Sequence, residues 1–343
     1  MPVPTRTVTA ENLHTFCSQI LQAVRVCKPD ADTTATIQVE ADLRGVHSHG
    51  TRAISRYTRQ ILNGKVNPEA NPHILKEGGA YVHIDGDNGL GQAVSHFAAE
   101  KAIEKARTSG IGMAAVRNST HFGAAAYYAQ MATEQNLVGF STTGGRKLSG
   151  NMAAFGSIEP VISNHPLAFA VPAGNEPPIV LDMATGVAAA GKISMAQTRG
   201  EKIPLDWALT QDGQPTDDPK EARIVQPLGP KGSGLSIIMN CIGGILTGAG
   251  FSDTAPFGHL IIAIDVATFA DLDTFKQEID TRIESIRNAK PAPGIDRVYY
   301  PGEQEALLKT ERLEQGIPML EPHLQDLEAI AAELSVTPPW EST

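Results

Sequence analysis

Cysteine, basic charge and long apolar runs are all scarce in this 343-residue sequence, and each scarcity excludes a class of protein. Three cysteines, Cys17, Cys27 and Cys241, form no Cys-x-x-Cys motif and no paired framework, so we expect free thiols in a reducing compartment. The longest apolar run, residues 237–246, is interrupted by polar and glycine residues and is far shorter than the roughly 18 residues of a membrane-spanning helix. Lys and Arg number 28 against 38 Asp and Glu, and the net charge of −10 argues against a nucleic-acid partner.

Three further sequence features are missing. Residues 1–16 contain no apolar segment of the kind that directs export, so we expect a cytoplasmic protein. No Gly-x-Gly-x-x-Gly follows a strand early in the chain, so the common dinucleotide-binding fold is not supported. Residues 186–192 match the start of a phosphate-binding P-loop, but Ile193 stands where a Ser or Thr must bind magnesium. We therefore do not expect a P-loop nucleotide site.

Helix-like and strand-like segments alternate along most of the chain, which indicates an α/β protein. Helices come first, and Thr9 is expected to cap the first of them. Short strands and helices follow, with a turn at residues 86–89 and a buried helix at 235–246. Residues 144–165 lack a regular pattern, and a loop of this length in a compact domain is often functional.

The densest polar cluster spans residues 41–50 and holds His47 and His49, with Arg52 and Arg56 just beyond. The cluster follows a predicted helix end and so lies on a loop, where catalytic groups are common. An arginine can bind a carboxylate through two hydrogen bonds while a histidine transfers a proton, which is what a 2-oxo or 2-hydroxy acid requires. A metal site has no third ligand at a fitting spacing, and a solvated helix start with surface arginines is the remaining alternative.

Three other segments carry polar groups where α/β proteins bind ligands. His121 follows a predicted strand, although packing of its ring against the next helix is equally open. Asp182 ends a buried strand, and a buried carboxylate needs a partner such as a histidine or a hydrogen-bond donor. Lys231 lies in a glycine-rich helix start, residues 229–234, which either attracts a phosphate or is a plain helix entry.

A series of motifs follows in order between residues 41 and 303, and the set is far more specific than any one of them. Together they resemble the malate/L-lactate dehydrogenase family of the non-Rossmann type. Members of that family include ureidoglycolate dehydrogenase, diketogulonate reductase, sulfolactate dehydrogenase and Δ1-piperideine-2-carboxylate reductase. The motifs are AxxRGxxSHG (41–50), THFG (120–123), NHPLAFAVP (164–172), DMATGVAAAGK (182–192), DGQPTDDP (212–219), GPKGSGL (229–235), GHLIIAID (258–265) and PAPGIDRVYYPGE (291–303).

The resemblance implies a three-layer α/β/α core with a mixed sheet, a non-Rossmann fold that binds NAD(P), and helical segments at both ends. Residues 1–75 would form an N-terminal helical segment that contributes the catalytic histidine and arginine. Residues 76–290 would form the α/β core that binds cofactor and substrate. Residues 291–343 would form a C-terminal helical segment that packs back on the N-terminal unit. Members are typically homodimers with a shared active-site cleft.

Residue roles also follow from the resemblance. His49, beside Ser48, is the leading proton donor, and His121 is the second candidate. Asp182 would lie near the nicotinamide or order the catalytic histidine. The expected residues for the substrate carboxylate are Arg52, Arg56 and Tyr57. The expected cofactor-binding residues are Gly145, His165, Asp182, Met183, Ala184, Lys231, Gly232, Gly302 and Glu303, and no metal is expected.

The sequence departs from the family pattern near the expected pocket. Relatives place an arginine four residues after the motif histidine, where this chain has Ala53, so Arg52 or Arg56 must replace it. Residues 163–166 read Ser-Asn-His-Pro instead of Gly-Thr-Asn-Pro. The stretch 142–154 is longer than usual, and the residues it adds suit a second acidic group or the ribose phosphate of NADP. The added residues are Arg146 and Lys147.

We therefore expect an NAD- or NADP-dependent oxidoreductase that transfers a hydride between the nicotinamide and a small 2-oxo or 2-hydroxy acid. The expected acids are of the malate, lactate or ureidoglycolate type. The alternative is a reductase of a cyclic imino acid, of the Δ1-piperideine- or Δ1-pyrroline-2-carboxylate type. The missing arginine also leaves open a catalytically inactive cofactor-binding homologue.

Overall fold

The computed structural model describes residues 4–145, 150–188, 190–249 and 257–340. Its centre is a seven-stranded mixed sheet in the order β2-β3-β4-β10-β5-β6-β7. β3 and β4 pair in parallel, and the other neighbouring strands are antiparallel. The strands are β2 (His73–Glu77), β3 (Tyr81–Gly89), β4 (Ile111–Ser119), β5 (Leu137–Gly145), β6 (Leu167–Val171), β7 (Ile179–Met183) and β10 (Phe257–Asp265).

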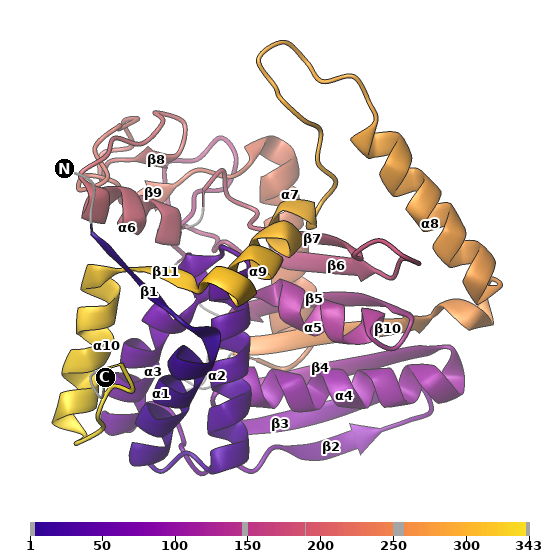
Figure 1. The fold of residues 1–343 in the computed structure, drawn as a ribbon, viewed down its shortest axis with the longest axis horizontal. Helices are drawn as coiled ribbons and strands as arrows, with labels where there is room; N and C mark the ends of the chain where they lie inside the picture. The colour runs from indigo at the N-terminus through magenta and orange to yellow at the C-terminus, as the bar shows by residue number, and fades with distance from the viewer. Residues whose placement is uncertain (1–3, 146–149, 189, 250–256, 341–343) are drawn as a thin grey trace.

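Helices cover both faces of this sheet, so the core has three layers (Figure 1). On one face, α4 (Gly91–Ser109) and α5 (Ala125–Thr133) pack through buried alanines, which let the helices approach the strands closely. On the other face lie α7 (Gly229–Asn240) and the π-helical turn η3 (Cys241–Ile245), with Met239 buried against Phe140 and Leu260. The expected α/β/α core with a mixed sheet is confirmed.

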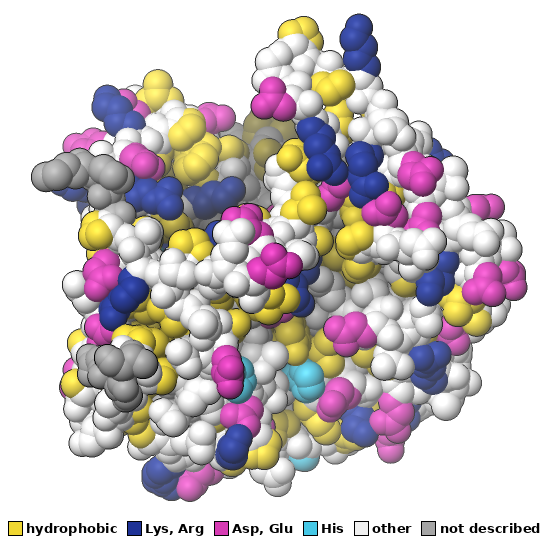
Figure 2. Space-filling model, viewed as in Figure 1, with side chains coloured by type: hydrophobic (Ala, Val, Ile, Leu, Met, Phe, Trp, Pro, Cys, Tyr) yellow, Lys and Arg dark blue, Asp and Glu magenta, His cyan; other side chains and the backbone are white. Residues whose placement is uncertain are grey.

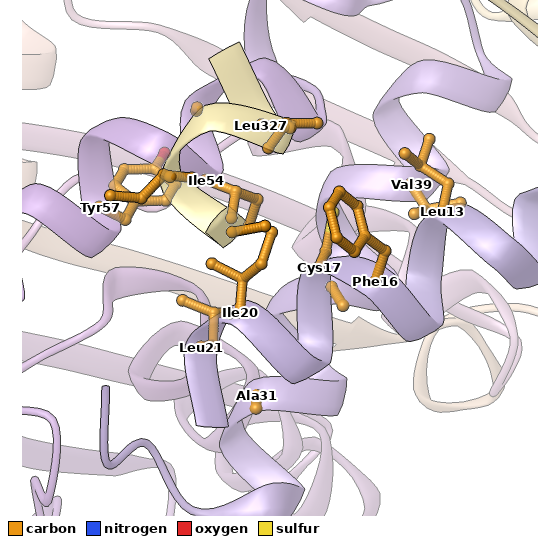
Figure 3. Packing of buried hydrophobic residues seen from close by; sticks show 14 of the residues in the cluster. Leu13, Phe16, Cys17, Ile20, Leu21, Ala31, Val39, Ile54, Tyr57 and Leu327 are labelled. Carbon is orange, nitrogen blue, oxygen red and sulfur yellow. The ribbon is translucent and has the colours of Figure 1, made fainter. Parts of the chain in front are cut away.

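A second hydrophobic core joins the two ends of the chain. Phe16 and Ile20 from the N-terminal helices pack in one cluster with Leu327 from the last helix (Figure 3). β1 pairs with β11 in an antiparallel ribbon beside this cluster. The elements of this unit are β1 (Thr5–Val8), α1 (Ala10–Ala23), α2 (Lys28–Leu43), η1 (His47–His49), η2 (Thr51–Ala53), α3 (Ile54–Leu62), β11 (Ile317–Leu320) and α10 (Glu321–Glu333).

Helix α8 (Leu272–Arg287) and residues 288–300 extend away from the rest of the molecule (Figure 1), and we call them the arm. Hydrophobic and basic side chains are exposed side by side on the arm (Figure 2), and the side chain of Ile295 is 55% exposed. The remaining elements are α6 (Ala190–Arg199), β8 (Ala208–Leu209), β9 (Ile224–Val225), η4 (Val266–Thr268) and α9 (Glu303–Gln315).

The arm is held by polar contacts at its base. The Asp280 carboxylate accepts hydrogen bonds from the backbone N–H groups of Gly174, at 2.9 Å, and Asn175, at 2.8 Å. The Arg287 guanidinium binds Glu176 through two hydrogen bonds of 2.9 and 2.7 Å and Glu303 through a third of 2.9 Å. Hydrogen bonds and ion pairs of Asp280 and Arg287 therefore connect the arm to the β6–β7 turn and to the start of α9.

The local predictions had mixed outcomes. Thr9 caps α1 as expected, because its hydroxyl accepts the N–H of Asn12 at 3.2 Å. The turn expected at residues 86–89 is wrong: β3 continues to Gly89 through an irregularity in which Asp87 and Asn88 adopt φ values of 51° and 53°. The Asn67 side-chain amide donates a hydrogen bond to the Asp87 carboxylate, and the Asp87 N–H donates one to the Asp85 carboxylate. These bonds stabilise the bulge.

The helix expected at 235–246 is present as α7 and the π-helical turn that follows it, but the expectation that it is buried is wrong. α7 packs through its small residues, and the Ser236 hydroxyl donates a hydrogen bond to the Ser163 carbonyl. Its apolar side is left open: Ile238 is 54% exposed and Ile245, in the following π-helical turn, is 65% exposed. None of the helices in the described ranges is both long and apolar enough to cross a membrane.

Candidate active site

A cleft of about 1280 Å³ opens where the N-terminal helical unit meets the ends of β4, β5 and β7. Its walls come from segments that are far apart in the sequence, including η1, the β4–α5 loop, the start of α6 and residues 299–305. The structure brings most of the expected site residues to this one cleft. The expected residues that line it are Ser48, His49, Arg52, Arg56, His121, Gly145, His165, Asp182, Met183, Ala184 and Gly302.

Asp42, on α2, holds the segment that carries His49. Its buried carboxylate accepts hydrogen bonds from the backbone N–H of Thr51, at 2.8 Å, from the Thr51 hydroxyl, at 2.6 Å, and from Nδ1 of His47, at 2.7 Å. A side chain at Gly50 would place its Cβ 2.0 Å from the same carboxylate, so this position requires glycine. The α2–η1 turn is thus fixed by a single charged group.

His47 does not take part in a metal site. Its Nε2 accepts a hydrogen bond of 3.1 Å from Arg312, while Nδ1 donates to Asp42, so both ring nitrogens are occupied. Within the part of the chain that the structure describes, no group of three His, Cys, Asp or Glu side chains is arranged to bind a metal ion.

His49 lies on the cleft with its Nδ1 atom 2.9 Å from the Ser48 hydroxyl. Its ring is stacked with that of His121 at a centroid distance of 5.8 Å and an angle of 18°. Burial, together with the positive charges of Arg56 and Arg52, lowers the pKa of His49 to about 4. The cleft therefore holds two parallel imidazoles beside two guanidinium groups.

His121 is presented by the loop that follows β4. The preceding Thr120 anchors this loop, because its hydroxyl accepts the N–H of Gly91 at 2.9 Å and donates to the Gly89 carbonyl at 3.0 Å. Nδ1 of His121 lies 2.8 Å from the Tyr57 hydroxyl and 3.3 Å from the N–H of Gly123. Burial lowers the pKa of His121 well below its usual value, and His49 and Arg56 add to the effect.

Arg52 supplies a cationic group with unused hydrogen-bonding capacity. Its Nη1 atom is buried and has no hydrogen-bond partner among the described residues. Burial and the neighbouring Arg56 lower its pKa, so the surroundings disfavour this charge until an anion arrives. A guanidinium with a free donor beside two histidines is suited to bind a carboxylate.

Asp182 ends β7 and accepts a hydrogen bond of 2.9 Å from the backbone N–H of Ala126, at the start of α5. Its side chain lines the cleft, and desolvation by the surrounding protein atoms raises its pKa to about 6. The Ala126 hydrogen bond opposes the rise, and the charge of Glu305 adds to it.

Two loops at the other end of the cleft are held by asparagines. The Asn240 amide, where α7 becomes π-helical, donates to the Gly145 carbonyl and to Nε2 of His165, the latter at 3.1 Å. Burial lowers the pKa of His165 to about 4, so this ring is neutral. The Asn164 side-chain oxygen accepts the N–H groups of Thr185 and Gly186 at 2.7 and 3.0 Å.

Four expected residues do not line the cleft. Tyr57 is buried in the N-terminal core and bonds to His121 instead. Glu303 is buried and paired with Arg287 and Arg297. Lys231 is exposed on α7, and Gly232 is packed against the Thr185 carbonyl. Arg146 and Lys147 lie outside the described residues.

Sequence reasoning missed Lys192 and Glu305, which both line the cleft. Lys192 stands in the first turn of α6, and the adjacent Gly191 lies so close to Ser48 that a Cβ there would be 2.7 Å from the serine Cβ. The P-loop-like run of residues 186–192 was the available indication. It marks a lysine at a helix start, where an anion is favoured, without a magnesium ligand.

The cleft fits a dinucleotide together with a small acid. Its volume exceeds the roughly 300–1,000 Å³ of common ligand pockets. Glycines leave backbone exposed along its wall, and Gly302, at φ 89°, approaches Val180 so closely that any Cβ would lie 2.8 Å away. Lys192 and Ser194, at the start of α6, are suited to hold a pyrophosphate.

Comparison with known proteins gives consistent matches. The profile of the family described as malate/L-lactate dehydrogenase matches residues 8–328. Malate dehydrogenase of Pyrococcus horikoshii is 36% identical over 96% of both chains. L-sulfolactate dehydrogenase of Methanocaldococcus jannaschii is 38% identical over 88% of this chain and 90% of that protein. Ureidoglycolate dehydrogenase (NAD(+)) of Escherichia coli is 30% identical over 92% and 93%.

Solved structures agree with the sequence comparison. The structure of malate dehydrogenase from Pyrococcus horikoshii OT3 superimposes with a TM-score of 0.88 over 97% of both chains, at 34% identity. Delta1-piperideine-2-carboxylate reductase from Pseudomonas syringae superimposes with a TM-score of 0.82 over 95% of this chain and 100% of the other, at 28% identity. The profile match and these relatives cover almost the whole chain, which therefore belongs to the malate/L-lactate dehydrogenase family.

Proposed function

We propose that the chain is an oxidoreductase that uses NAD or NADP to interconvert a small 2-hydroxy acid and the corresponding 2-oxo acid. The observation that carries this proposal is the stacked pair of His49 and His121 beside the unpaired Nη1 of Arg52, all on one cleft. Relatives named as malate, sulfolactate and NAD(+)-dependent ureidoglycolate dehydrogenases support the reaction class and the cofactor.

Different residues of the cleft have different roles in this reaction. Arg52, with its unpartnered Nη1, binds the carboxylate of the acid and so orients its second carbon and oxygen, while Arg56 offers a second positive charge to the same cleft. The nicotinamide, when bound, supplies or accepts the hydride. His49 gives the proton to the developing alkoxide in reduction and takes it back in oxidation. A carboxylate between the two arginines also offsets their effect on His49 and raises its pKa toward the working range.

The paired arginines further favour an acid with two anionic groups. A single carboxylate needs one guanidinium fork, whereas Arg52 and Arg56 offer two positive charges to the same cleft. Malate carries two carboxylates and sulfolactate carries a carboxylate and a sulfonate, and both acids appear in the names of relatives. We therefore place a dianionic acid ahead of lactate as the substrate.

Reduction of a cyclic imino acid is the second candidate. The structural match to delta1-piperideine-2-carboxylate reductase favours it, because a protein of that name shares this fold over almost the whole chain. Such a substrate has one carboxylate, so the second arginine would remain unused. Competition between oxaloacetate and Δ1-piperideine-2-carboxylate in one assay separates the two candidates.

The decay of nicotinamide absorbance tests the proposal directly. NADH and NADPH are each supplied with pyruvate, oxaloacetate, 2-oxoglutarate, sulfopyruvate and Δ1-piperideine-2-carboxylate. Turnover with oxaloacetate or sulfopyruvate at a kcat/KM above that with pyruvate supports a dianionic acid. Cofactor binding without turnover on every acid would indicate an inactive homologue and contradict the proposal.

We also propose that the protein is a homodimer in the cytoplasm. The open apolar side of α7, with Ile238 and Ile245, supports a homodimer that buries this surface next to the cleft. Three free cysteines support a reducing compartment, the cytoplasm. Light scattering of the purified protein measures the dimer, and a monomer across the working concentration range would contradict it.

A further inference from the structure

Tyr57 makes a contact that the reaction described above does not use. Its ring is 1% exposed and packs beside Ile54 in the N-terminal core (Figure 3). Its hydroxyl reaches out of that core to Nδ1 of His121, at 2.8 Å. One hydrogen bond therefore joins the helical unit to a histidine presented by the sheet.

The donors around Nδ1 determine where the His121 proton lies. The backbone N–H of Gly123 points at Nδ1 from 3.3 Å and can only donate. The Tyr57 hydroxyl also neighbours the Arg56 guanidinium, which has donors only, and the side-chain amides of Gln38 and Gln92. Because the Gly123 N–H donates to Nδ1, this nitrogen carries no proton, so the Tyr57 hydroxyl 2.8 Å away must be a donor to it. A neutral imidazole that accepts at Nδ1 carries its proton on Nε2.

The charged groups around His121 keep the ring neutral. His49 faces it from η1, Arg56 from α3 and His259 from β10, while Phe257 meets it edge-on. Burial and these groups lower the pKa of His121, and no carboxylate among them opposes the effect. Burial raises the pKa of Tyr57, so its hydroxyl stays protonated and available to donate.

We propose that Tyr57 is a positioning residue that fixes His121 as the neutral Nε2–H tautomer. His121 then gives a hydrogen bond to the substrate oxygen from Nε2 and does not exchange its proton, and His49 alone carries the proton. The role toward substrate rests on the proposed function, whereas the tautomer is a property of the protein alone.

Nitrogen NMR of ¹⁵N-histidine-labelled protein tests the tautomer without substrate or cofactor. In the wild type we expect an unprotonated Nδ1 and a protonated Nε2 on His121, unchanged between about pH 5.5 and pH 8. In Tyr57→Phe one of the two hydrogen-bond donors to Nδ1 is lost. The ¹⁵N chemical shifts of both ring nitrogens should then move toward the values of a mixture of tautomers. His121→Gln assigns the resonances.

Tyr128→Phe is the matched control. Tyr128 is a second buried tyrosine, and its hydroxyl donates to the carbonyl of Phe122, next to His121 in the chain but not to the ring. Tyr128→Phe should leave the His121 nitrogens unchanged. Equal changes of the His121 ¹⁵N chemical shifts in both variants would show that displacement of the loop causes them. Unchanged shifts in Tyr57→Phe would show that Tyr57 does not fix the tautomer. Either result overturns the inference.

Kinetics provide a second readout. We expect kcat of Tyr57→Phe to fall by about 10- to 100-fold, as for other residues that orient a catalytic group. KM should change by less than about threefold, because the arginines that bind the carboxylate are untouched. The expected nitrogen spectra in a protein that turns over no acid would support Tyr57 while contradicting the proposed function. Normal turnover in Tyr57→Phe would contradict the role of the tautomer in the reaction.

Discussion

At the residue scale, Arg52 and Arg56 line the same cleft but have different surroundings. Arg52 has a buried and unpartnered Nη1, whereas Arg56 lies over the Tyr57 ring. We therefore predict that Arg52→Ala raises KM for the acid by about 10- to 100-fold, the loss expected for a charge-assisted hydrogen bond of about 1.5–3 kcal/mol. With pyruvate, which carries a single carboxylate, Arg56→Ala should raise KM much less. Steady-state kinetics of both variants measures the difference.

Arg52→Lys is the control for this comparison, because it keeps the charge and removes the two-pronged hydrogen bonding. Its KM should fall between those of the wild type and Arg52→Ala. Small and equal effects of both alanine substitutions would mean that neither arginine binds the carboxylate.

His49 is expected to carry the proton. His49→Gln keeps a polar side chain of similar size but cannot transfer a proton, so kcat should fall by about 10²- to 10⁴-fold. Affinity for NADH or NADPH, measured by fluorescence titration, should change by less than about threefold. A kcat within about threefold of the wild type would instead assign proton transfer to His121.

Much of the site is predictable from single residues because the chemistry depends on side-chain type. His49, His121 and Asp182 were found from their motifs, and the arginines from their position just after the histidine cluster, and all line the cleft. Tyr57 and Glu303 were placed on the ligand, and the structure places them elsewhere. Their partners, His121 and Arg287, lie on other elements, so only the tertiary structure determines what these side chains contact.

At the element scale, the arm depends on polar contacts more than on buried apolar area. Asp280→Ala removes the acceptor for the N–H groups of Gly174 and Asn175. We predict that amide hydrogen exchange at these two residues accelerates at least about tenfold, while Tm falls by only about 2–6 °C. Glu278→Ala, at an exposed position on the same helix, is the control and should change neither. Unchanged exchange at Gly174 would show that the turn is held by other contacts.

Element positions were predictable where local rules decide them. Thr9 and the alternation of strands and helices act through neighbouring residues, and their predictions were confirmed. The burial of α7 was not predictable, because it depends on which face meets the sheet. Its serines and glycines make the close contacts, and its isoleucines remain open in the single chain. The irregularity in β3 likewise depends on the side chain of Asn67, a distant residue.

At the scale of the whole molecule, four histidines with lowered pKa values, two of them buried and two half-buried in the cleft, make the fold sensitive to acid. Burial lowers the pKa of His49 and His165 to about 4 and that of His259 to about 3, and lowers the pKa of His121 well below its usual value. Between about pH 6.5 and pH 4 the unfolded chain binds protons that the folded protein does not, so the free energy of unfolding decreases as pH falls.

We therefore predict that Tm decreases steadily from about pH 7 to about pH 5, measured by calorimetry in buffers of constant ionic strength. His259→Gln removes one of the four groups, and its Tm should depend less steeply on pH whatever its absolute value. His259 is bound on both sides, by Thr143 at 2.9 Å and Ser119 at 3.0 Å. A Tm independent of pH in this range would contradict the prediction.

The core that joins both ends of the chain also sets the order of events during synthesis. Phe16 and Ile20 leave the ribosome early, but Leu327, which covers them, follows roughly 300 residues later. At a synthesis rate of about 5–20 residues per second, about 15–60 s pass between the synthesis of the first helices and that of the last helix, which packs on them. Arg312, which steadies the His47 ring, arrives equally late. Catalytic competence is therefore among the last properties that the nascent chain acquires, and until then its earliest helices expose apolar surface to chaperones.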